Sequence, residues 1–390
     1  MYLDRLFKLM AEKQASDLFI SCGAPMSMKI NGVVMPLTNQ RMDIDTVRRV
    51  AYELMNEEQA KIFDTEFEMN LSHLDPAVGN FRINIFRQRG TISLVIRYVR
   101  SDIPPFEELK LPPVLLELVM EKRGLVLIAG ATGSGKSTTL AAMIDHRNTQ
   151  KTGHILTIED PIEYLFRHKK SIVNQRELSV DTLTYTKALA NALREAPDLI
   201  MIGEIRDRET MQHTLLHTLT GHLCLATLHA NNSYHALSRI INMFPHDARS
   251  GLLSDLSIGL RAIVSQRLVR TTDGGLQPAV EILLNSSLIA ELVKNGEIVQ
   301  IKEAMEKSLY PGSQTFEQAL CRLYLDKRIS YEEAMTASDS STNLAWLINQ
   351  NAPDSRVGAM ARDGEKAKSQ QIRSDFNELQ IEPEMLDRPQ

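Results

Sequence analysis

The chain has 390 residues, of which 43% are hydrophobic and 24% charged, a balance typical of globular proteins that build a buried core. At about 150 residues per domain, this length predicts two or three domains. The formal net charge of −5 and the isoelectric point near 6.1 offer no broad electrostatic attraction to nucleic acid, which favours basic proteins.

The first 100 residues predict a small α+β module. Residues 1–10 place apolar side chains at helical spacing between charged ones, which predicts a helix and argues against a signal peptide. The longest apolar runs are too short to span a bilayer, so we expect a cytoplasmic protein. The next expected elements are strands at Asp17–Ser21 and Met26–Leu37 (turning at Asn31-Gly32), a helix from Asp45 to Phe63, and a hairpin of Asn80–Arg87 and Thr91–Arg100 around Gly90.

Prolines separate this module from a different pattern. Pro104-Pro105 and Pro112-Pro113 predict a linker over residues 101–113. Over residues 114–285, buried-strand runs alternate with helical segments, which predicts an α/β domain with a parallel sheet. The strands expected there are Gly124–Gly130, His154–Glu159, Leu199–Gly203 and Leu223–Leu228. Residues 286–349 have helical periodicity, and residues 350–390 are too polar to bury a core, so we expect a disordered tail.

The cysteines narrow the class of protein further. Cys22, Cys224 and Cys321 lie far apart and form no C-x-x-C pair. This arrangement argues against a zinc knuckle and against a disulfide framework. We therefore expect free thiols in a reducing cytosol.

A complete phosphate-binding loop follows the first strand of the α/β domain. It reads Gly130-Ala131-Thr132-Gly133-Ser134-Gly135-Lys136-Ser137 and leads into a helix that starts near Thr138. The glycines let backbone N–H groups surround phosphate oxygens, and the helix N-terminus adds partial positive charge. We expect Lys136 to reach the β- and γ-phosphates of ATP and the Ser137 hydroxyl to bind Mg²⁺.

A second strand ends in an acid. Asp198–Glu204 is an apolar run with a terminal carboxylate, the Walker B pattern, although Asp is the more usual residue at that position. The pattern predicts that Glu204 joins the magnesium shell, through a water molecule.

Two further stretches place polar side chains after strands. Thr157–Glu163 carries three carboxylates, each of which could orient a water molecule or cap a helix. Thr220–His222 and Thr227–His229 bracket another strand, and a lone histidine at such a position is more often structural. His213 and His217 stand one helical turn apart, but Thr214 occupies the position that a zinc protease motif gives to glutamate.

These motifs together resemble one family. The run from Leu193 to Asp207, LREAPDLIMIGEIRD, is similar to the signature of the type II/IV secretion system ATPases. The carboxylate stretch resembles the family's Asp box, and the histidine stretch resembles its His box. The similarity extends from the N-terminal module to about residue 349. It implies an N-terminal PAS-like domain followed by a RecA-like P-loop ATPase core, with ATP and Mg²⁺ as ligands.

The resemblance also implies roles for individual residues. It makes Glu163 the general base that polarises the attacking water, a choice that the residues alone leave open between Glu159, Asp160 and Glu163. It implies that His229 senses the γ-phosphate or links neighbouring subunits.

In the family, the N-terminal module supplies arginines to the nucleotide site of the assembled ring. The resemblance places three arginines of the predicted hairpin at the matching positions. They are Arg82, Arg89 and Arg97. Arginine suits phosphate because its planar guanidinium offers several donors and a permanent charge. Their alternation with apolar residues is equally compatible with a solvent-facing strand.

The compact plan resembles the pilus retraction (PilT/PilU) branch of the family. In Leu288–Lys294, which matches the branch's retraction helix, Ala290 stands where an arginine is expected, a departure that resembles the accessory members. We therefore expect a hexameric motor for type IV pilus retraction and twitching motility. Its implied partners are a PilT-type retraction ATPase and an inner-membrane pilus platform protein. The alternatives are a nucleotide-binding scaffold with little turnover, a pilus-assembly or secretion ATPase, and a nucleic-acid translocase, which the charge disfavours.

Overall fold

The computed structural model describes residues 2–30, 32–75, 78–99, 102–308 and 310–351. Its contacts divide the chain into two compact units. The first consists of residues 1–105 and 141–203, and the second of residues 106–140 and 204–390. The domain boundaries expected from the sequence, including the linker at 101–113, stay predictions.

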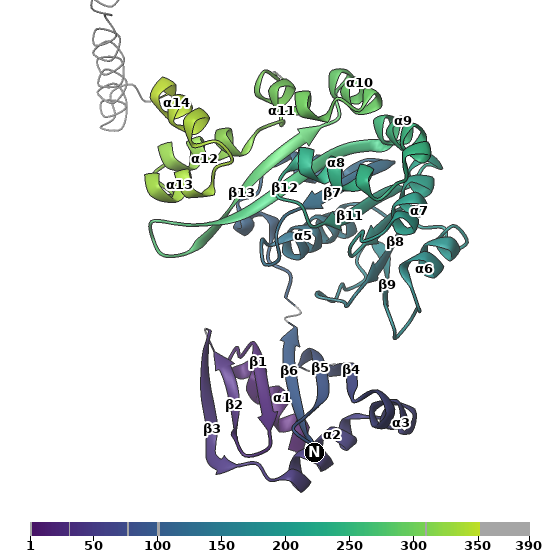
Figure 1. Ribbon diagram of the computed structural model, residues 1–390, viewed down its shortest axis with the longest axis vertical. Helices are drawn as coiled ribbons and strands as arrows, with labels where there is room; N and C mark the ends of the chain where they lie inside the picture. The colour runs from purple at the N-terminus through teal and green to yellow at the C-terminus, as the bar shows by residue number, and fades with distance from the viewer. Residues whose placement is uncertain (1, 31, 76–77, 100–101, 309, 352–390) are drawn as a thin grey trace, which may run out of the picture. The chain divides into compact units, whose positions relative to one another are not determined.

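The N-terminal part of the first unit is a six-stranded antiparallel sheet with the order β3-β2-β1-β6-β5-β4 (Figure 1). Phe81, Ile83 and Ile85 alternate along β5 and are buried, together with Phe7 of helix α1. This alternation puts one face of the sheet against the helices, as expected for a half-buried strand. The elements are α1 (Tyr2–Glu12), β1 (Asp17–Ser21), β2 (Pro25–Ile30), β3 (Val33–Arg41), β4 (Glu68–Asp75), β5 (Gly79–Gln88) and β6 (Thr91–Val99).

The helix predicted from Asp45 to Phe63 is two helices. α2 (Ile44–Leu54) ends before Asn56, and α3 (Glu57–Glu66) begins after it. The Asn56 side chain accepts from the backbone N–H of Gln59, whose side chain accepts in turn from the backbone N–H of Asn56. This capping box satisfies free donors at the start of α3 and so favours a new helix over continuation of the first.

A seven-stranded, mostly parallel sheet has the order β13-β12-β7-β11-β10-β8-β9. The four strands predicted from the sequence correspond to β7, β8, β10 and β11, and the α/β fold class is confirmed. The prediction missed β9, β12 and β13, of which the last two pair antiparallel. The bounds are β7 (Gly124–Ala129), β8 (Gly153–Glu159), β9 (Ser171–Glu177), β10 (Leu199–Ile202), β11 (Leu223–Leu228), β12 (Leu260–Arg270) and β13 (Leu276–Leu284).

Helices alternate with most strands of the seven-stranded sheet along the chain, as expected for an α/β domain. In the segment predicted to be helical, 286–349, the structure has α10 to α14. The predicted tail lies outside the described residues from 352 onward. The helices are η1 (Phe106–Leu109), α4 (Val114–Met120), α5 (Lys136–Gln150), α6 (Tyr185–Ala192), α7 (Arg208–Leu219), α8 (Ser233–Asn242), η2 (His246–Ala248), α9 (Arg249–Gly259), α10 (Ser287–Asn295), α11 (Ile298–Glu306), α12 (Phe316–Leu325), α13 (Tyr331–Ala337) and α14 (Ser341–Asn351). Of the helices in the described ranges, none has both the length and the apolar character needed to cross a bilayer.

The C-terminal helices have a small core of their own. Phe316, Leu320, Leu344 and Ile348 are buried in one cluster with apolar side chains of β12 and β13. In the second unit, α12, α13 and α14 therefore pack against the long hairpin of β12 and β13, which is visible in Figure 1. Apolar burial of this kind is the main stabilising contribution to such packing.

Candidate nucleotide-binding site

The phosphate loop joins the end of β7 to the start of α5 in the second unit. Gly135 has φ = +88°, a conformation that side chains with a Cβ rarely adopt. A Cβ added there would also lie 2.7 Å from Nε2 of Gln266, and one added at Gly130 would lie 2.6 Å from the Gln266 carbonyl oxygen. Both conformation and close packing therefore require glycine at the ends of this loop.

Lys136 is the first residue of α5 and is buried beneath the loop. Its Nζ donates to the carbonyl oxygens of Gly130 (3.0 Å) and Ala131 (2.9 Å). The ammonium group is thus held inside the curve of the loop, at the N-terminus of a 15-residue helix. A positive charge and a helix N-terminus at one place are suited to binding phosphate.

The other predicted members of the loop lie around this lysine. Ala131, Thr132 and Gly133 are exposed, Ser134 is buried, and Ser137 and Thr138 are partly buried at the start of α5. A cavity of about 230 Å³ adjoins this end of the helix. It is lined by the linker segment 108–111, by Gly135 and Thr138, and by side chains of β12 and β13.

Glu204 and His229, which are far apart in the sequence, contact one another in the second unit. His229 Nε2 lies 3.3 Å from one carboxylate oxygen of Glu204, and Arg206 Nε donates to the other at 2.7 Å. The backbone N–H of Ile205 donates to the carbonyl of Thr227 at 3.0 Å, which aligns the two segments. Arg206 stands two residues after Glu204, but no pattern in the sequence marks it as a partner of that carboxylate.

The Asp box surrounds a buried acid at the end of β8 in the first unit. Burial raises the pKa of Glu159 to about 7, although its carboxylate accepts hydrogen bonds from Thr157 Oγ1 (2.6 Å) and Gln175 Nε2 (3.2 Å). The predicted base, Glu163, is different because its side chain is 47% exposed. An acid with a strongly raised pKa is a frequent feature of functional sites, so Glu159 is a further candidate.

The three arginines have different surroundings. Arg82 lies beside the Asp box, with Nη2 3.8 Å from the Glu163 carboxylate and 3.2 Å from the carbonyl of Pro161. Arg97, its direct partner across β5 and β6, donates through Nε to Asp17 at 2.8 Å. Arg89 is exposed in the tight turn between the two strands, with φ = +47°.

The histidine pair of α7 is placed differently from His229. His217 is fully buried, and its ring lies 5.7 Å from that of His222 in an edge-on arrangement. His213 is half-buried. Within the described ranges, no three His, Cys, Asp or Glu residues are grouped closely enough to hold a metal ion. Magnesium in nucleotide sites relies on few protein ligands together with water and phosphates, and a hydroxyl such as Ser137 and a carboxylate such as Glu204 are oxygen donors that fit it.

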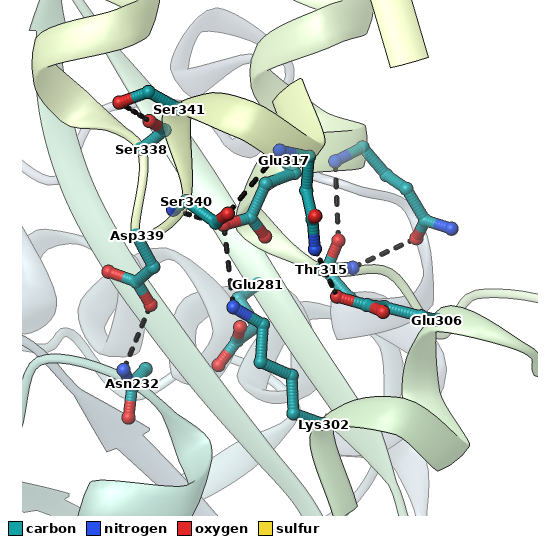
Figure 2. A network of polar contacts seen from close by, with 12 residues as sticks. Asn232, Glu281, Lys302, Glu306, Thr315, Glu317, Ser338, Asp339, Ser340 and Ser341 are labelled. Carbon is teal, nitrogen blue, oxygen red and sulfur yellow. Dashed lines mark hydrogen bonds and ion pairs between the residues drawn. The ribbon is translucent and has the colours of Figure 1, made fainter. Parts of the chain in front are cut away.

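A polar network connects the segment after His229 to the C-terminal helices, all within the second unit (Figure 2). Asn232 Nδ2 donates to Asp339 at 2.9 Å, and Glu317 accepts from the backbone N–H of Ser340 at 2.9 Å. Lys302 Nζ lies 3.7 Å from Glu317. This network could not be predicted from the sequence, because its members are spread over about a hundred residues of the described chain and form no motif.

Arg267 of β12 joins the same network. It donates to the carbonyl oxygens of Asn231 (3.0 Å) and Ala337 (2.6 Å), forms an ion pair with Asp339, and lies over the Phe316 ring at 4.0 Å. Beneath it, Ser233 donates to Glu281 through its backbone N–H (2.8 Å) and its hydroxyl (2.7 Å). The segment that follows His229 is therefore held from both the sheet and the C-terminal helices.

Comparisons with known proteins agree with this architecture. The family model described as "Type II/IV secretion system protein" matches residues 1–372. The chain is 49% identical to the type IV pilus ATPase PilU of Pseudomonas aeruginosa, over 89% of this chain and 91% of that protein. It is 38% identical to the retraction ATPase PilT of the same organism, over 86% of this chain and 97% of that one.

A solved structure supports the same assignment. The crystal structure of the pilus retraction motor PilT with bound ADP superposes with a TM-score of 0.82 at 40% identity, and covers 87% of this chain and 97% of that one. The chain therefore belongs to the type II/IV secretion system protein family and, within it, to the branch of ATPases that contains PilT and PilU.

Proposed function

We propose that this chain hydrolyses ATP to drive type IV pilus retraction, as an accessory to a PilT-type retraction ATPase. The observation that carries the proposal is the phosphate loop with Lys136 held inside it, in a chain 49% identical to PilU. The proposed assembly is a homo-hexamer at the cytoplasmic face of the inner membrane, where it acts on an inner-membrane pilus platform protein.

In the proposed mechanism the loop binds the triphosphate. Backbone N–H groups of residues 130–138 and the Lys136 ammonium stabilise the β- and γ-phosphates. Ser137 and, through water, Glu204 would hold Mg²⁺, which neutralises charge on the phosphates. The 3.3 Å distance between Glu204 and His229 supports a role for His229 in sensing the γ-phosphate. A change in the position or charge of the carboxylate would alter its interaction with the imidazole ring.

The proposed base is Glu163. Its carboxylate is 47% exposed, so water can reach it, and Arg82 Nη2 lies 3.8 Å from it. Glu159 is the alternative base, because a pKa of about 7 would also suit proton transfer near neutral pH. Comparing the Glu163→Gln and Glu159→Gln variants separates the two assignments.

The arginines are proposed to act on the nucleotide within the ring. Arg82, Arg89 and Arg97 lie on one hairpin, and loss of an arginine finger costs about 10³–10⁵-fold in rate. If Arg97 acts across a subunit boundary, mixing Arg97→Ala subunits with Lys136→Ala subunits restores partial ATPase activity. Stable mixed rings without any recovery would contradict this geometry.

An accessory role rests on α10. Ala290 occupies the helix position where the retraction branch is expected to have an arginine, and alanine preserves the helix while removing the charge. Cells with this protein but no PilT-type ATPase should therefore hydrolyse ATP without retracting pili. Cells whose PilT-type ATPase is present but inactivated in its phosphate loop should still retract. Retraction in the complete absence of that partner would refute the accessory role.

The main competing function is a nucleotide-binding scaffold with little turnover. The presence of Lys136, Glu163 and Glu204 together disfavours it, since a scaffold has no need of all three groups. Steady-state ATP hydrolysis by the purified protein decides between the two. A pilus-assembly or secretion role is a third candidate, and pilus extension assays in a deletion strain would detect it.

A further inference from the structure

Gln266 of β12 lies directly behind the phosphate loop and is only 3% exposed. Its side-chain Nε2 donates to the carbonyl oxygen of Ser134 at 2.8 Å. Its Oε1 accepts from the hydroxyl of Thr139 at 2.8 Å. A single buried amide therefore joins the loop to the first turn of α5, on either side of Lys136.

The sheet gives Gln266 this position. β12 runs parallel to β7 and pairs Ser265 with Ala129, so Gln266 is level with the point where β7 ends and the loop begins. The loop backbone packs closely on it, as the short distances for a Cβ at Gly130 or Gly135 indicate. Gln266 thus contacts the phosphate loop in two ways, through hydrogen bonds of its side chain and through close packing against the loop glycines.

The amide is suited to this task by its chemistry. Glutamine offers a donor and an acceptor on one planar group, and both are used here by buried partners that have few alternatives. If an apolar side chain of similar length replaces Gln266, the Ser134 carbonyl and the Thr139 hydroxyl stay buried but lose their hydrogen-bond partner. This loss is unfavourable, so we expect the loop to leave its position.

We propose that Gln266 is a positioning residue that holds the phosphate loop in its nucleotide-binding conformation. This inference rests on the proposed function, because it assumes that the loop binds nucleotide. The residue touches no reacting atom, and its effect passes through Ser134 and Thr139.

A positioning role predicts an effect on affinity more than on turnover. The loop contacts the phosphates in both the ground state and the transition state, so loosening it weakens both by a similar amount. Apparent affinity falls in proportion to the fraction of molecules with a competent loop. For the Gln266→Met variant we expect the Kd for ADP and the KM for ATP to rise about tenfold, and kcat at saturation to change less than about threefold.

The matched control is Gln314→Met. Gln314 is half-buried, and its Nε2 donates to the carbonyl of Val280 at 2.7 Å, at β13. Each substitution removes a hydrogen bond from a side-chain amide to a backbone carbonyl, so both variants should have a lower melting temperature than the unaltered protein. Only Gln266→Met should weaken ADP binding, measured by titration calorimetry on the full-length protein. An ADP affinity for folded Gln266→Met equal to that of the unaltered protein would overturn the proposal.

A second pair of variants keeps the test decisive if Gln266→Met does not fold. Thr139→Val removes one hydroxyl without changing the size of the side chain, and leaves Oε1 of Gln266 without its donor. We expect weaker ADP binding in Thr139→Val and recovery in Thr139→Ser, which restores the hydroxyl. Equal affinities in the two variants would contradict the proposal. Absence of ADP binding by the unaltered protein would instead contradict the proposed function.

Discussion

The phosphate loop and the segment after His229 are both held by polar side chains, but the side chains differ in kind. Behind the loop the partners are a neutral amide and a hydroxyl, Gln266 and Thr139. Around Asn232 and Ser233 they are mainly ionisable, with carboxylates at Glu281, Glu317 and Asp339 and cations at Arg267 and Lys302. An amide and a hydroxyl do not ionise near neutral pH, whereas burial raises the pKa of the Glu281 carboxyl. We therefore expect the loop to be less sensitive to pH than the packing around Glu281.

The largest effect is expected at the loop itself. Lys136→Ala removes the ammonium group that we propose to bind the phosphates, so we expect loss of measurable ATP turnover. The fold should persist, because the lysine Nζ donates to two carbonyl oxygens within its own loop rather than to a distant element. Steady-state hydrolysis and thermal unfolding measured on the same preparation test both halves of this expectation. Collapse of the fold would show that the loop and its lysine are structural as well as functional.

The next effect separates chemistry from binding. Glu163→Gln removes the proposed proton acceptor and is expected to lower kcat about 10²–10⁴-fold while ATP still binds. Glu159→Gln, which keeps the hydrogen-bond acceptor of a buried group, is the matched comparison. Near-normal hydrolysis by Glu163→Gln together with an inactive Glu159→Gln would reassign the base.

A change in the charged network should affect stability rather than nucleotide binding. Arg267→Met breaks the ion pair with Asp339 and two bonds to backbone carbonyls, and is expected to lower the free energy of unfolding by about 3 kcal/mol. The control is Lys307→Met, whose ion pair with Glu303 has side chains 75% and 67% exposed, and whose free energy of unfolding should stay close to that of the unaltered protein. Urea unfolding gives both values. A large loss of ADP affinity in Arg267→Met would remove the contrast between the two regions.

The smallest effect concerns pH. Burial, with the negative charges of Asp339 and Glu317 adding to it, raises the pKa of Glu281 above its ordinary value of 4.5. The folded protein therefore binds this proton more tightly than the unfolded chain does, so the contribution of Glu281 to stability falls as pH rises above about 4.5. When the pH is raised from 5 to 8, the free energy of unfolding should fall less for Glu281→Gln than for the unaltered protein. Parallel pH profiles for the two proteins would contradict this assignment.

The sequence predicted the parts of the site that are local in the chain. The glycines and Lys136 stand in one short run, and the strand before them is an unbroken apolar stretch, so both the loop and its context could be recognised. The strands β12 and β13 were missed because polar residues, among them Gln266 and Glu281, interrupt their apolar runs, so neither shows an unbroken apolar stretch or a regular alternation. Residues 262–269 include three consecutive polar residues, so nothing in the sequence alone singled out Gln266.

The remaining part of the site depends on tertiary contacts that no spacing reveals. Glu204 and His229 are 25 positions apart and meet because neighbouring strands end at the same edge. The raised pKa of Glu159 has a similar origin, since burial, its main cause, is a property of the folded chain. The break between α2 and α3 was visible as the N-x-x-Q pattern at Asn56, although the helical periodicity on both sides concealed it.

The register of β12 has a consequence for how this gene can change. Successive side chains of a strand point to opposite faces, and here Gln266 serves the phosphate loop while Arg267 serves the C-terminal helices. Deletion or insertion of one codon within β12 would exchange the two faces, bringing a guanidinium to the loop and an amide to the helices. A single substitution in this strand alters the contacts of one residue, whereas a change of length by one residue alters those of both faces together. We expect related proteins to accept insertions in the turn at residues 271–275 and not within the strand.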